Sequence, residues 1–435
     1  MTAPVGEQPE SEAAARPIRG ARAYWVLLAL IAGLAIGAVA QGMGDGLREP
    51  ALKGATIIGG LWLNALKMTV IPLVVSLLVV GIAKGAEAAR AGRIAARSVL
   101  WFVAIVTSSA IFGALLMPVL LRLLPLSAAS AEALRTGLAA IDPAAASGTV
   151  PAVADFFATV IPSNVAFAAS NGDVLPLTVF ALLLGLALAR VAPSRRAPVV
   201  AFFEGLGEAL LIIIGWVLWV APLGVFALAF AVGSGAGAAA FAGLAHYILL
   251  VSALGVLIML AGYAVAVIGG GVSPLAFAKA MIGPQAVAIS TQSSLASLPA
   301  MLGATRLLDV DERVADVTLP LSVALFRATG PAMNIGVVIY VAHWLGTDVS
   351  LGHAIAAVAV ASIVSYGAVS LPGQISFFSS IAPISMAMGV PIAPLALLVA
   401  VEMIPDIFRT LGNVTMDVAV TTAVDRHARN STAAA

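Results

Sequence analysis

The sequence predicts an all-α polytopic membrane protein with eight transmembrane helices and two re-entrant helical hairpins, arranged as inverted repeats. Three observations lead to this class. Hydrophobic residues make up 61% of the 435 residues and charged residues only 10%, whereas soluble domains carry roughly 25% charged residues. Several uninterrupted apolar runs are long enough to cross a ~30 Å hydrocarbon core. Two later apolar stretches are interrupted by polar residues, Pro and Gly, which is typical of non-helical backbone that lines a cavity at membrane depth.

Composition and charge narrow the class further. A formal net charge of +1 provides no strong basic field, so we expect no nucleic-acid partner. The chain has no Cys, which excludes disulfides and thiolate metal sites, and its four scattered His residues favour no metal cluster. We therefore expect membrane lipid as the surrounding solvent and no resident cofactor.

Eight spans follow from the apolar runs. The arm over residues 1–22 is polar, rich in Ala, Glu and Pro, and expected to be disordered and cytoplasmic. The first run imitates a secretory signal with a small-residue cleavage site, but its length and the runs behind it favour an uncleaved span. The predicted spans are residues 24–42, 54–83, 99–121, 174–192, 209–232, 244–269, 312–345 and 396–424.

Lys and Arg in the loops determine the orientation. With the N-terminus inside, the outer loops receive few basic residues and the inner loops receive many. The outer ones are Arg48, Lys53, Arg122 and Arg135, and the inner ones are Lys84, Arg90, Arg93, Arg97, Arg190, Arg195, Arg196, Arg426 and Arg429. Both termini, including the tail over residues 426–435, are therefore expected on the cytoplasmic side of the cytoplasmic (inner) membrane.

Two interrupted stretches predict re-entrant hairpins. Residues 275–308 are apolar on both sides of the break 290–294, and residues 353–395 on both sides of the break 370–374. Each half is too short to cross the bilayer. Broken segments in corresponding positions of two halves indicate a transport site at a repeat interface, where free amides at a tip can hold an anion. The alternatives are a Ser-rich kink in an ordinary span and an accidental pair of Pro/Gly breaks.

The last span carries the strongest local signal. Five polar residues spaced 4, 3, 4 and 4 apart share one helix face, with Thr410 at its edge: Glu402, Asp406, Arg409, Asn413 and Asp417. A charge at the membrane centre costs about 2.5–3.5 kcal/mol, so this face is expected to line a polar cavity. The alternative is an internal ion-pair ladder that only docks the helix, since Asp406 and Arg409 can neutralise each other.

Arg327 stands in an apolar stretch of the seventh span. Gly330 and Pro331 follow it and predict local unwinding of the helix. A buried guanidinium stays charged and must find a carboxylate, for which Asp417 and Glu402 are the candidates. Snorkelling of Arg327 to the membrane interface is the alternative.

These motifs resemble a known family, the glutamate transporter homologues, which are dicarboxylate/amino acid:cation (sodium:dicarboxylate) symporters. Residues 63–74 look like that family's second span, 161–164 and 174–177 like the run into its fourth, and 291–299 like the tip of its first hairpin. The most specific match is the D-x-x-R-T-x-x-N-V-T-x-D string over residues 406–417. The resemblance covers nearly the whole chain.

The resemblance implies a homotrimer whose protomers transport independently. Each protomer would have a static scaffold and a mobile transport domain that works as an elevator, with the second hairpin around Pro372 and Gly373 as the outer gate. The scaffold would be residues 23–96 (spans 1–2) and 123–240 (spans 4–5 with the outer loop). The transport domain would be residues 97–122 (span 3) and 241–425 (spans 6–8 with both hairpins).

The resemblance also implies roles for single residues. Asp406 would bind the amino group of a substrate, Arg409 its side-chain carboxylate and Asn413 its α-carboxylate. The physical chemistry agrees, because a guanidinium grips a carboxylate bidentately and a carboxylate selects an ammonium. Asn413 and Asp417 would also be cation ligands. The substrate site would be completed by Ser293, Ser294, Thr410 and Gly373.

The seventh span departs from the family. Where the family has Asn-Met-Asp-Gly-Thr, which helps to build its sodium sites, residues 326–330 read Phe-Arg-Ala-Thr-Gly and lack a carboxylate. We hypothesise that Arg327 is an internal cation that replaces sodium. Three acids then face two bases on these helices, and the unmatched carboxylate, with Glu402 as a candidate, would take up a proton as the coupling ion. Sodium bound at Asp417 and an uncoupled carrier are the alternatives.

We therefore expect a symporter, a secondary active transporter of acidic amino acids such as aspartate or glutamate, coupled to sodium or protons. A C4-dicarboxylate would offer no ammonium to Asp406, and a neutral amino acid would leave Arg409 without a carboxylate. A sensor that binds the ligand without moving it is a further alternative. We expect no enzyme, because the sequence has no Ser/His pairing, metal-ligand spacing or nucleophile elbow.

Overall fold

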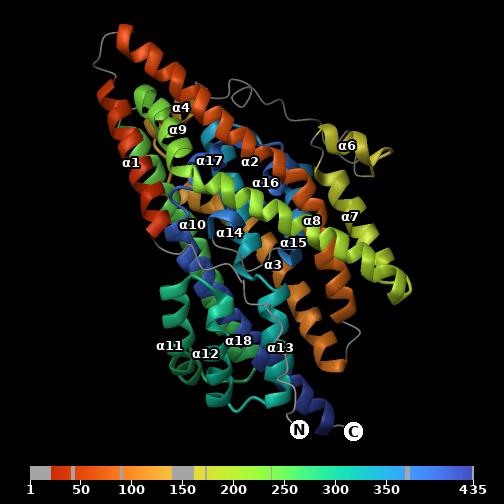
Figure 1. Ribbon diagram of the computed structural model, residues 1–435. Helices are drawn as coiled ribbons and strands as arrows, with labels where there is room; N and C mark the ends of the chain where they lie inside the picture. Colours follow the sequence, from red (N-terminus) through yellow and green to blue (C-terminus); the bar gives the residue numbers. More distant parts are fainter. Residues whose placement is uncertain are drawn as a thin grey trace, which may run out of the picture.

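The computed structural model consists of helices joined by turns (Figure 1). It describes residues 21–40, 45–88, 92–139, 161–171, 174–236, 238–367 and 373–433, and none of these residues lies in a strand. Within these ranges, five helical stretches are long and apolar enough to cross a membrane: Leu47–Glu87, Arg93–Leu123, Pro193–Trp219, Ala239–Gly269 and Glu312–Leu345. The prediction of an all-helical chain rich in apolar helices is confirmed.

One group of helices packs around α2 (Asp45–Ala88). At 44 residues this helix is about 66 Å long, well beyond the predicted span over residues 54–83. It contacts α7 (Val174–Leu188), α8 (Pro193–Trp219) and α9 (Ala221–Ala236), and α9 also packs on α1 (Ala21–Ala40) and α4 (Ala128–Ala139). The α1–α9 approach needs small residues, because a Cβ at Gly37 would lie 2.4 Å from the carbonyl oxygen of Phe230. The short helix α6 (Val165–Asn171) precedes α7.

A second group surrounds α18 (Met403–Ala433). Figure 1 shows α11 (Pro274–Thr291), α12 (Ser294–Leu307) and α13 (Glu312–Leu325) beside α18 at the end of the molecule where the C-terminus lies. The helix also contacts α3 (Arg93–Leu123), α14 (Thr329–Leu345) and α10 (Ala238–Ala264), which continues as the π-helical turn η2 (Val265–Gly269). α18 is therefore the helix around which this part of the chain is organised.

The first predicted hairpin corresponds to two packed helices, α11 (Pro274–Thr291) and α12 (Ser294–Leu307). They join at Gln292, which is in the left-handed region (φ 50°), and at Ser293, whose hydroxyl accepts the Ala296 N–H (3.3 Å) and caps α12. Their 18 and 14 residues correspond to about 27 and 21 Å. The break predicted at residues 290–294 is confirmed.

The second predicted hairpin corresponds to α15 (Leu351–Gly367) and α16 (Gly373–Ala387), which pack on each other and on α2. Most of the predicted break, including Pro372, lies outside the described residues. Gly373 is the first residue of α16.

The seventh predicted span is divided into α13 (Glu312–Leu325) and α14 (Thr329–Leu345). The chain between them is non-helical, and Arg327 lies in this break. The predicted unwinding is confirmed, but it falls slightly earlier than Gly330 and Pro331. Pro331 lies in the first turn of α14, where its missing N–H and fixed φ are tolerated.

Two other spans were predicted wrongly as continuous helices. The span over residues 209–232 is divided at Val220, and the span over 396–424 becomes α17 (Ala393–Leu398), a turn, and α18. A proline ring clashes with the carbonyl four residues earlier. Pro222 and Pro405 lie in the first turns of α9 and α18, directly after these breaks, and disfavour a continuous helix there.

Both ends of the chain also differ from prediction. Residues 1–20 of the predicted disordered arm lie outside the described residues, but Ala21 and Arg22 already belong to α1. The predicted tail over 426–435 is helical to Ala433, because α18 does not end at residue 424. Arg426 supports this extension by donating to the carbonyl of Ile268 (3.0 Å).

The contact between α3 and α14 gives a test of this packing. A Cβ at Gly113 would lie 2.5 Å from backbone atoms of Ala332, and backbone yields less than a flexible side chain. Gly113→Ala should therefore lower the melting temperature of the detergent-purified protein, with an overpacking cost of about 1–3 kcal/mol. Gly215→Ala, whose Cβ would meet nothing within 4 Å, is the matched control and should not destabilise. Equal melting temperatures for the two variants would contradict this packing.

Candidate functional site

The polar residues of the last span are buried at the beginning of α18. The exposed fractions are 1% for Glu402, 6% for Asp406, 9% for Arg409, 2% for Asn413 and 1% for Asp417. Glu402 does not belong to the helix as predicted, because it lies in the turn before Met403. Its carbonyl accepts the N–H of Asp406 (2.8 Å), so the turn leads directly into α18 and keeps the two acids close together.

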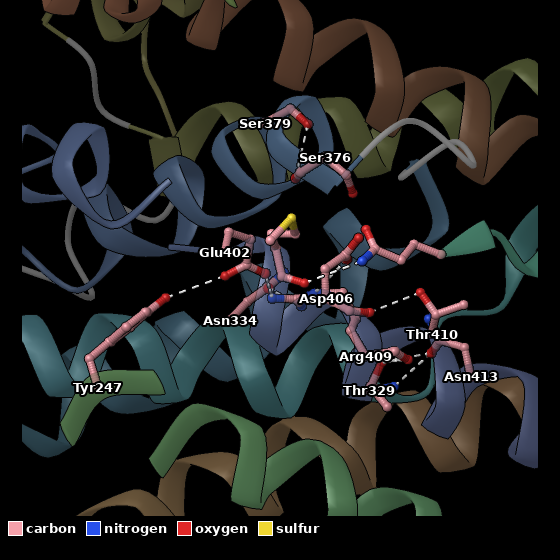
Figure 2. Close-up of polar contacts among 12 residues, drawn as sticks. Tyr247, Thr329, Asn334, Ser376, Ser379, Glu402, Asp406, Arg409, Thr410 and Asn413 are labelled. Carbon is pink, nitrogen blue, oxygen red and sulfur yellow. Dashed lines mark hydrogen bonds and ion pairs between the residues drawn. The ribbon is translucent and has the colours of Figure 1, made fainter. Parts of the chain in front are cut away.

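Arg409 is the centre of the site, and its guanidinium contacts three side chains (Figure 2). Nη2 donates to Oε1 of Glu402 (2.7 Å) and Nη1 donates to Oδ1 of Asn334 on α14 (2.7 Å). Nε lies 3.6 Å from Oδ1 of Asp406, an ion-pair distance. Short charge-assisted bonds of this kind are the strongest in proteins, so the guanidinium is held in one orientation.

Two further hydroxyls extend the site. Tyr247 of α10 donates to Oε2 of Glu402 (3.4 Å), so both oxygens of this carboxylate are in use. The Thr410 hydroxyl donates to the backbone carbonyl of Asp406 (2.9 Å), within the first turns of α18. Thr410, which was predicted at the edge of the polar helix face, is therefore hydrogen-bonded to Asp406.

Asn413 connects α18 to the broken seventh span. Its Oδ1 accepts the backbone N–H of Thr329 (3.0 Å) and the Thr329 hydroxyl (2.8 Å), and that hydroxyl is also 2.9 Å from the carbonyl of Arg409. The amide oxygen of Asn413 is therefore occupied by Thr329. Its NH2 group is the part of the side chain that can donate to a carboxylate.

Asp417 and Arg327 are two further buried charges near the site. Arg327 interacts electrostatically with Asp417 and, more weakly, with Asp406. Ser322 lies close to Asp417, but its hydroxyl donates to the carbonyl of Leu319 (2.8 Å), and neither Asp417 oxygen has a hydrogen bond within the part of the chain that is described. Of the two partners predicted for Arg327, the structure favours Asp417, because Glu402 is bonded to Arg409.

The first hairpin reaches this site with its tip. Gln292 donates to the carbonyl of Met403, the first residue of α18 (3.4 Å). Ser294 is buried and Ser293 caps α12 with its hydroxyl oxygen, which leaves the hydroxyl hydrogen to donate elsewhere. On the other side, Figure 2 shows Ser376 and Ser379 of α16 beyond Glu402, and α16 contacts α18. Gly373, a predicted site residue, is the first residue of α16.

Three contributors to the site were not predicted. Asn334 does have a signal, since it is an amide in the middle of an apolar run, and Thr329 directly precedes Gly330 and Pro331. Tyr247 has none, because one tyrosine in an apolar helix is ordinarily a core residue. In the described ranges, no group of three or more His, Asp or Glu residues is arranged to hold a metal ion.

A helical chain that has several apolar helices long enough to cross a membrane, and charged side chains buried among them, has the features of an integral membrane transporter. The chain belongs to the sodium:dicarboxylate symporter family, because the family model matches residues 23–427. It is a secondary symporter of this family, and the family consists of transporters rather than enzymes.

Its relatives are similar over nearly their whole length. The chain is 29% identical to the proton/sodium-glutamate symport protein of Bacillus subtilis over 90% of this chain and 89% of the relative. It is 27% identical to the proton/glutamate-aspartate symporter of Escherichia coli over 91% and 90%. It is also 29% identical to the C4-dicarboxylate transport protein of an Anaeromyxobacter species over 92% and 88%.

The Arg409 contacts give a stability prediction. Glu402→Ala removes the closest carboxylate of the buried Arg409 guanidinium. The free energy of unfolding should fall by about 3–5 kcal/mol, which is measured as a large fall in melting temperature. Glu402→Gln keeps an oxygen acceptor for Arg409 and should cost less. The control is Glu87→Ala, which removes an exposed partner of Arg196 (2.9 Å) and should cost at most about 1 kcal/mol. Similar losses in Glu402→Ala and Glu87→Ala would show that the pair is not a structural element.

Proposed function

We propose that this protein takes up acidic amino acids such as aspartate and glutamate across the cytoplasmic membrane. The observation that carries the proposal is the pairing of Arg409 with Asp406 at 3.6 Å, both buried beside Asn413. A guanidinium, a carboxylate and an amide NH2 in one buried site complement the two carboxylates and the ammonium of such a substrate. Two of the relatives are named as glutamate symporters.

In this proposal, the substrate exchanges with an internal ligand. The carboxylate of Glu402 accepts a hydrogen bond from the guanidinium of Arg409 and so occupies the position that the side-chain carboxylate of the substrate would take. When the substrate carboxylate bonds to Arg409, Glu402 loses its countercharge inside a buried site. A buried carboxylate without a partner is strongly disfavoured, so Glu402 takes up a proton. Substrate and proton then bind together, which is the requirement for symport.

The charge balance supports this coupling. Three acids (Glu402, Asp406 and Asp417) face two bases (Arg327 and Arg409), so the empty site carries one net negative charge, and an acidic amino acid adds another. One proton on Glu402 removes the charge that the substrate brings. Arg327 beside Asp417 supplies a fixed cation where sodium would otherwise bind, so we propose a proton as the coupling ion. Sodium binding at Asp417 is the alternative.

We further propose the architecture that this transport requires. The group around α2 is the scaffold (residues 23–96 and 123–240), and the group around α18 with α15 and α16 is the elevator-type transport domain (97–122 and 241–425). The shortness of α11, α12, α15 and α16 supports two re-entrant hairpins, with the second as the outer gate at Gly373. We propose eight spans, cytoplasmic termini, an inner-membrane location and a homotrimer.

A C4-dicarboxylate is the second candidate substrate, because one relative is named as a C4-dicarboxylate transport protein. The two candidates differ in the ammonium group that Asp406 would bind. Asp406→Asn should weaken aspartate binding about 10- to 100-fold through loss of a charge-assisted bond, and should leave succinate binding unchanged. Binding is measured by isothermal titration of the purified protein. Equal losses for both ligands, or tight succinate binding to the wild type, would favour the dicarboxylate.

Transport with separate gradients tests the proposal as a whole. Proteoliposomes are given a proton gradient or a sodium gradient, never both, and uptake of radiolabelled aspartate is followed. We expect uptake with protons in sodium-free buffer. A strict sodium requirement would overturn the role of Arg327, and no uptake under either condition would overturn the substrate. Counterflow of labelled aspartate distinguishes a carrier from a sensor, because a sensor binds without exchange.

Arg327→Met tests the internal cation directly. The variant removes the positive charge near Asp417, so aspartate binding in sodium-free buffer should fall at least tenfold. Sodium should restore aspartate binding, because it can bind at Asp417 in place of the missing guanidinium. Arg313→Met is the control, because the Arg313 side chain is 87% exposed and pairs with Asp311 on the surface. Unchanged binding without sodium in Arg327→Met would contradict the surrogate role.

A further inference from the structure

A series of polar side chains leads from the end of α3 to Glu402. His246 of α10 is partly exposed, and its Nε2 lies 2.9 Å from the carbonyl oxygen of Leu124, the residue directly after α3. Its Nδ1 lies 3.1 Å from the hydroxyl of Tyr340 on α14, which is completely buried. The imidazole is thus partly exposed on one side and in contact with the protein interior on the other.

The hydrogen-bond pattern around His246 has a place for a hydrogen on each ring nitrogen. The Leu124 carbonyl only accepts, so Nε2 must carry a hydrogen. The single hydroxyl hydrogen of Tyr340 is donated to the carbonyl of Gly243 (2.8 Å). The Nδ1–Tyr340 contact can then be a hydrogen bond only when Nδ1 also carries a hydrogen, as in the imidazolium. When His246 is neutral, the Tyr340 hydroxyl must turn from Gly243 to Nδ1.

Tyr340 connects this histidine with the substrate site. Its ring lies edge-on to the ring of Tyr247, with centroids 5.4 Å apart. Tyr247 is also completely buried, and its hydroxyl donates to Oε2 of Glu402 (3.4 Å). Figure 2 shows Tyr247 reaching Glu402 from the side opposite to Thr410. Two buried tyrosines in ring contact therefore lie between the partly exposed imidazole and the carboxylate.

We propose that His246 is the proton-loading site of this transporter, and that the hydroxyls of Tyr340 and Tyr247 carry the proton between His246 and Glu402. This rests on the proposed function, in which Glu402 takes up a proton as the substrate displaces it from Arg409. An imidazole suits the task because it binds and releases protons near neutral pH. With the proposed topology, α3 ends on the outer side, so His246 samples the outer solution.

The proton moves without any net change in the relay groups. Nδ1 of the imidazolium gives its hydrogen to the Tyr340 oxygen. The original hydroxyl hydrogen of Tyr340 leaves the Gly243 carbonyl and passes through a water molecule to the Tyr247 oxygen. The hydroxyl hydrogen of Tyr247 then passes to Oε2 of Glu402. His246 ends neutral, Glu402 ends protonated, and both tyrosines end as hydroxyls. Neutral His246 regains its proton from the outer solution.

Few other charged groups compete for the proton. The elements that contact α10 include α1, α3, α4, α9, α11, α14, α18 and η2. Of these, α9 and η2 carry no titratable residue, α1 carries Arg22 and α11 carries Lys279. Toward the end of α10 that holds His246, α3 ends with Arg122, α14 carries His343, and α4 carries Glu132 and Arg135, which pair with each other at 3.4 Å. Arg135 also donates to the carbonyl of Trp344. Around Tyr247 and Glu402, α18 supplies Asp406 and Arg409, which form the site itself.

The test is proton-driven uptake by His246→Gln in proteoliposomes. The amide retains a donor and an acceptor for Leu124 and Tyr340 but does not bind a proton. We expect the initial rate of uptake at saturating aspartate to fall about tenfold, with unchanged aspartate affinity at fixed pH. Imidazole added outside His246→Ala vesicles should restore the rate, because a diffusible base can then load the proton. Tyr340→Phe and Tyr247→Phe should be slow and resistant to this rescue.

Matched variants and the wild type separate the possible failures. His343→Gln and Tyr263→Phe change the same residue types on α14 and α10 outside the relay and should transport at the wild-type rate. Wild-type rates in His246→Gln, or rescue of Tyr340→Phe by imidazole, would overturn the relay and leave the proposed function intact. Wild-type protein that moves no protons with aspartate, read from a pH dye inside the vesicles, would overturn both.

Discussion

The charge of Arg409 is the constraint on which this structure depends. A guanidinium cannot lose its proton inside a protein, and in a low-dielectric interior it needs a carboxylate and further acceptors to offset the loss of water. The chain meets this need with Glu402 and Asn334, both at 2.7 Å, and with Asp406 at 3.6 Å. These acceptors come from a turn, from α14 and from α18. The position of Arg409 thus fixes how the last two spans pack.

The breaks in the last two spans serve the same constraint. In a continuous helix through residue 402, the backbone groups would bond to each other, and the helical geometry would fix the direction of the Glu402 side chain. Pro405 ends that helix, and the resulting turn lets Glu402 bond to Arg409 while its carbonyl caps α18. The break before Thr329 likewise exposes a backbone N–H, which Asn413 accepts. At each break, backbone or side-chain groups are available for contacts with other helices, whereas in a regular helix they would bond within the helix.

Much of this site could be predicted from the sequence, and the reason is the cost of polar groups in lipid. Arg409, Asp406 and Asn413 stand out because apolar helices rarely carry such residues without a function. The first hairpin was predictable from its Ser-rich break, which Gln292 and Ser293 confirm. The interruption of the seventh span was predictable from Gly330 and Pro331, although the chain unwinds slightly before them.

The remaining features depend on long-range contacts that a linear pattern does not contain. Glu402 pairs with Arg409 rather than Arg327, because the turn before α18 changes the direction of the Glu402 side chain. Hydrophobic periodicity does not reveal a turn of this kind at a proline. Tyr247 lies 155 residues from Glu402 in the chain, so only the folded packing of α10 on α18 brings them together. The same holds for His246 and Tyr340, which are 94 residues apart.

In the proposed mechanism, Glu402 bonds to the guanidinium of Arg409 until a substrate carboxylate replaces it. An experimental structure of the protein with aspartate bound, compared with one of the empty protein, tests this exchange directly. We expect the empty protein to keep the Glu402–Arg409 contact. In the complex we expect Arg409 to bond to a carboxylate of aspartate, Glu402 to have moved away and Asp406 to face the ammonium. A complex in which Glu402 remains bonded to Arg409, with aspartate held elsewhere, would contradict it.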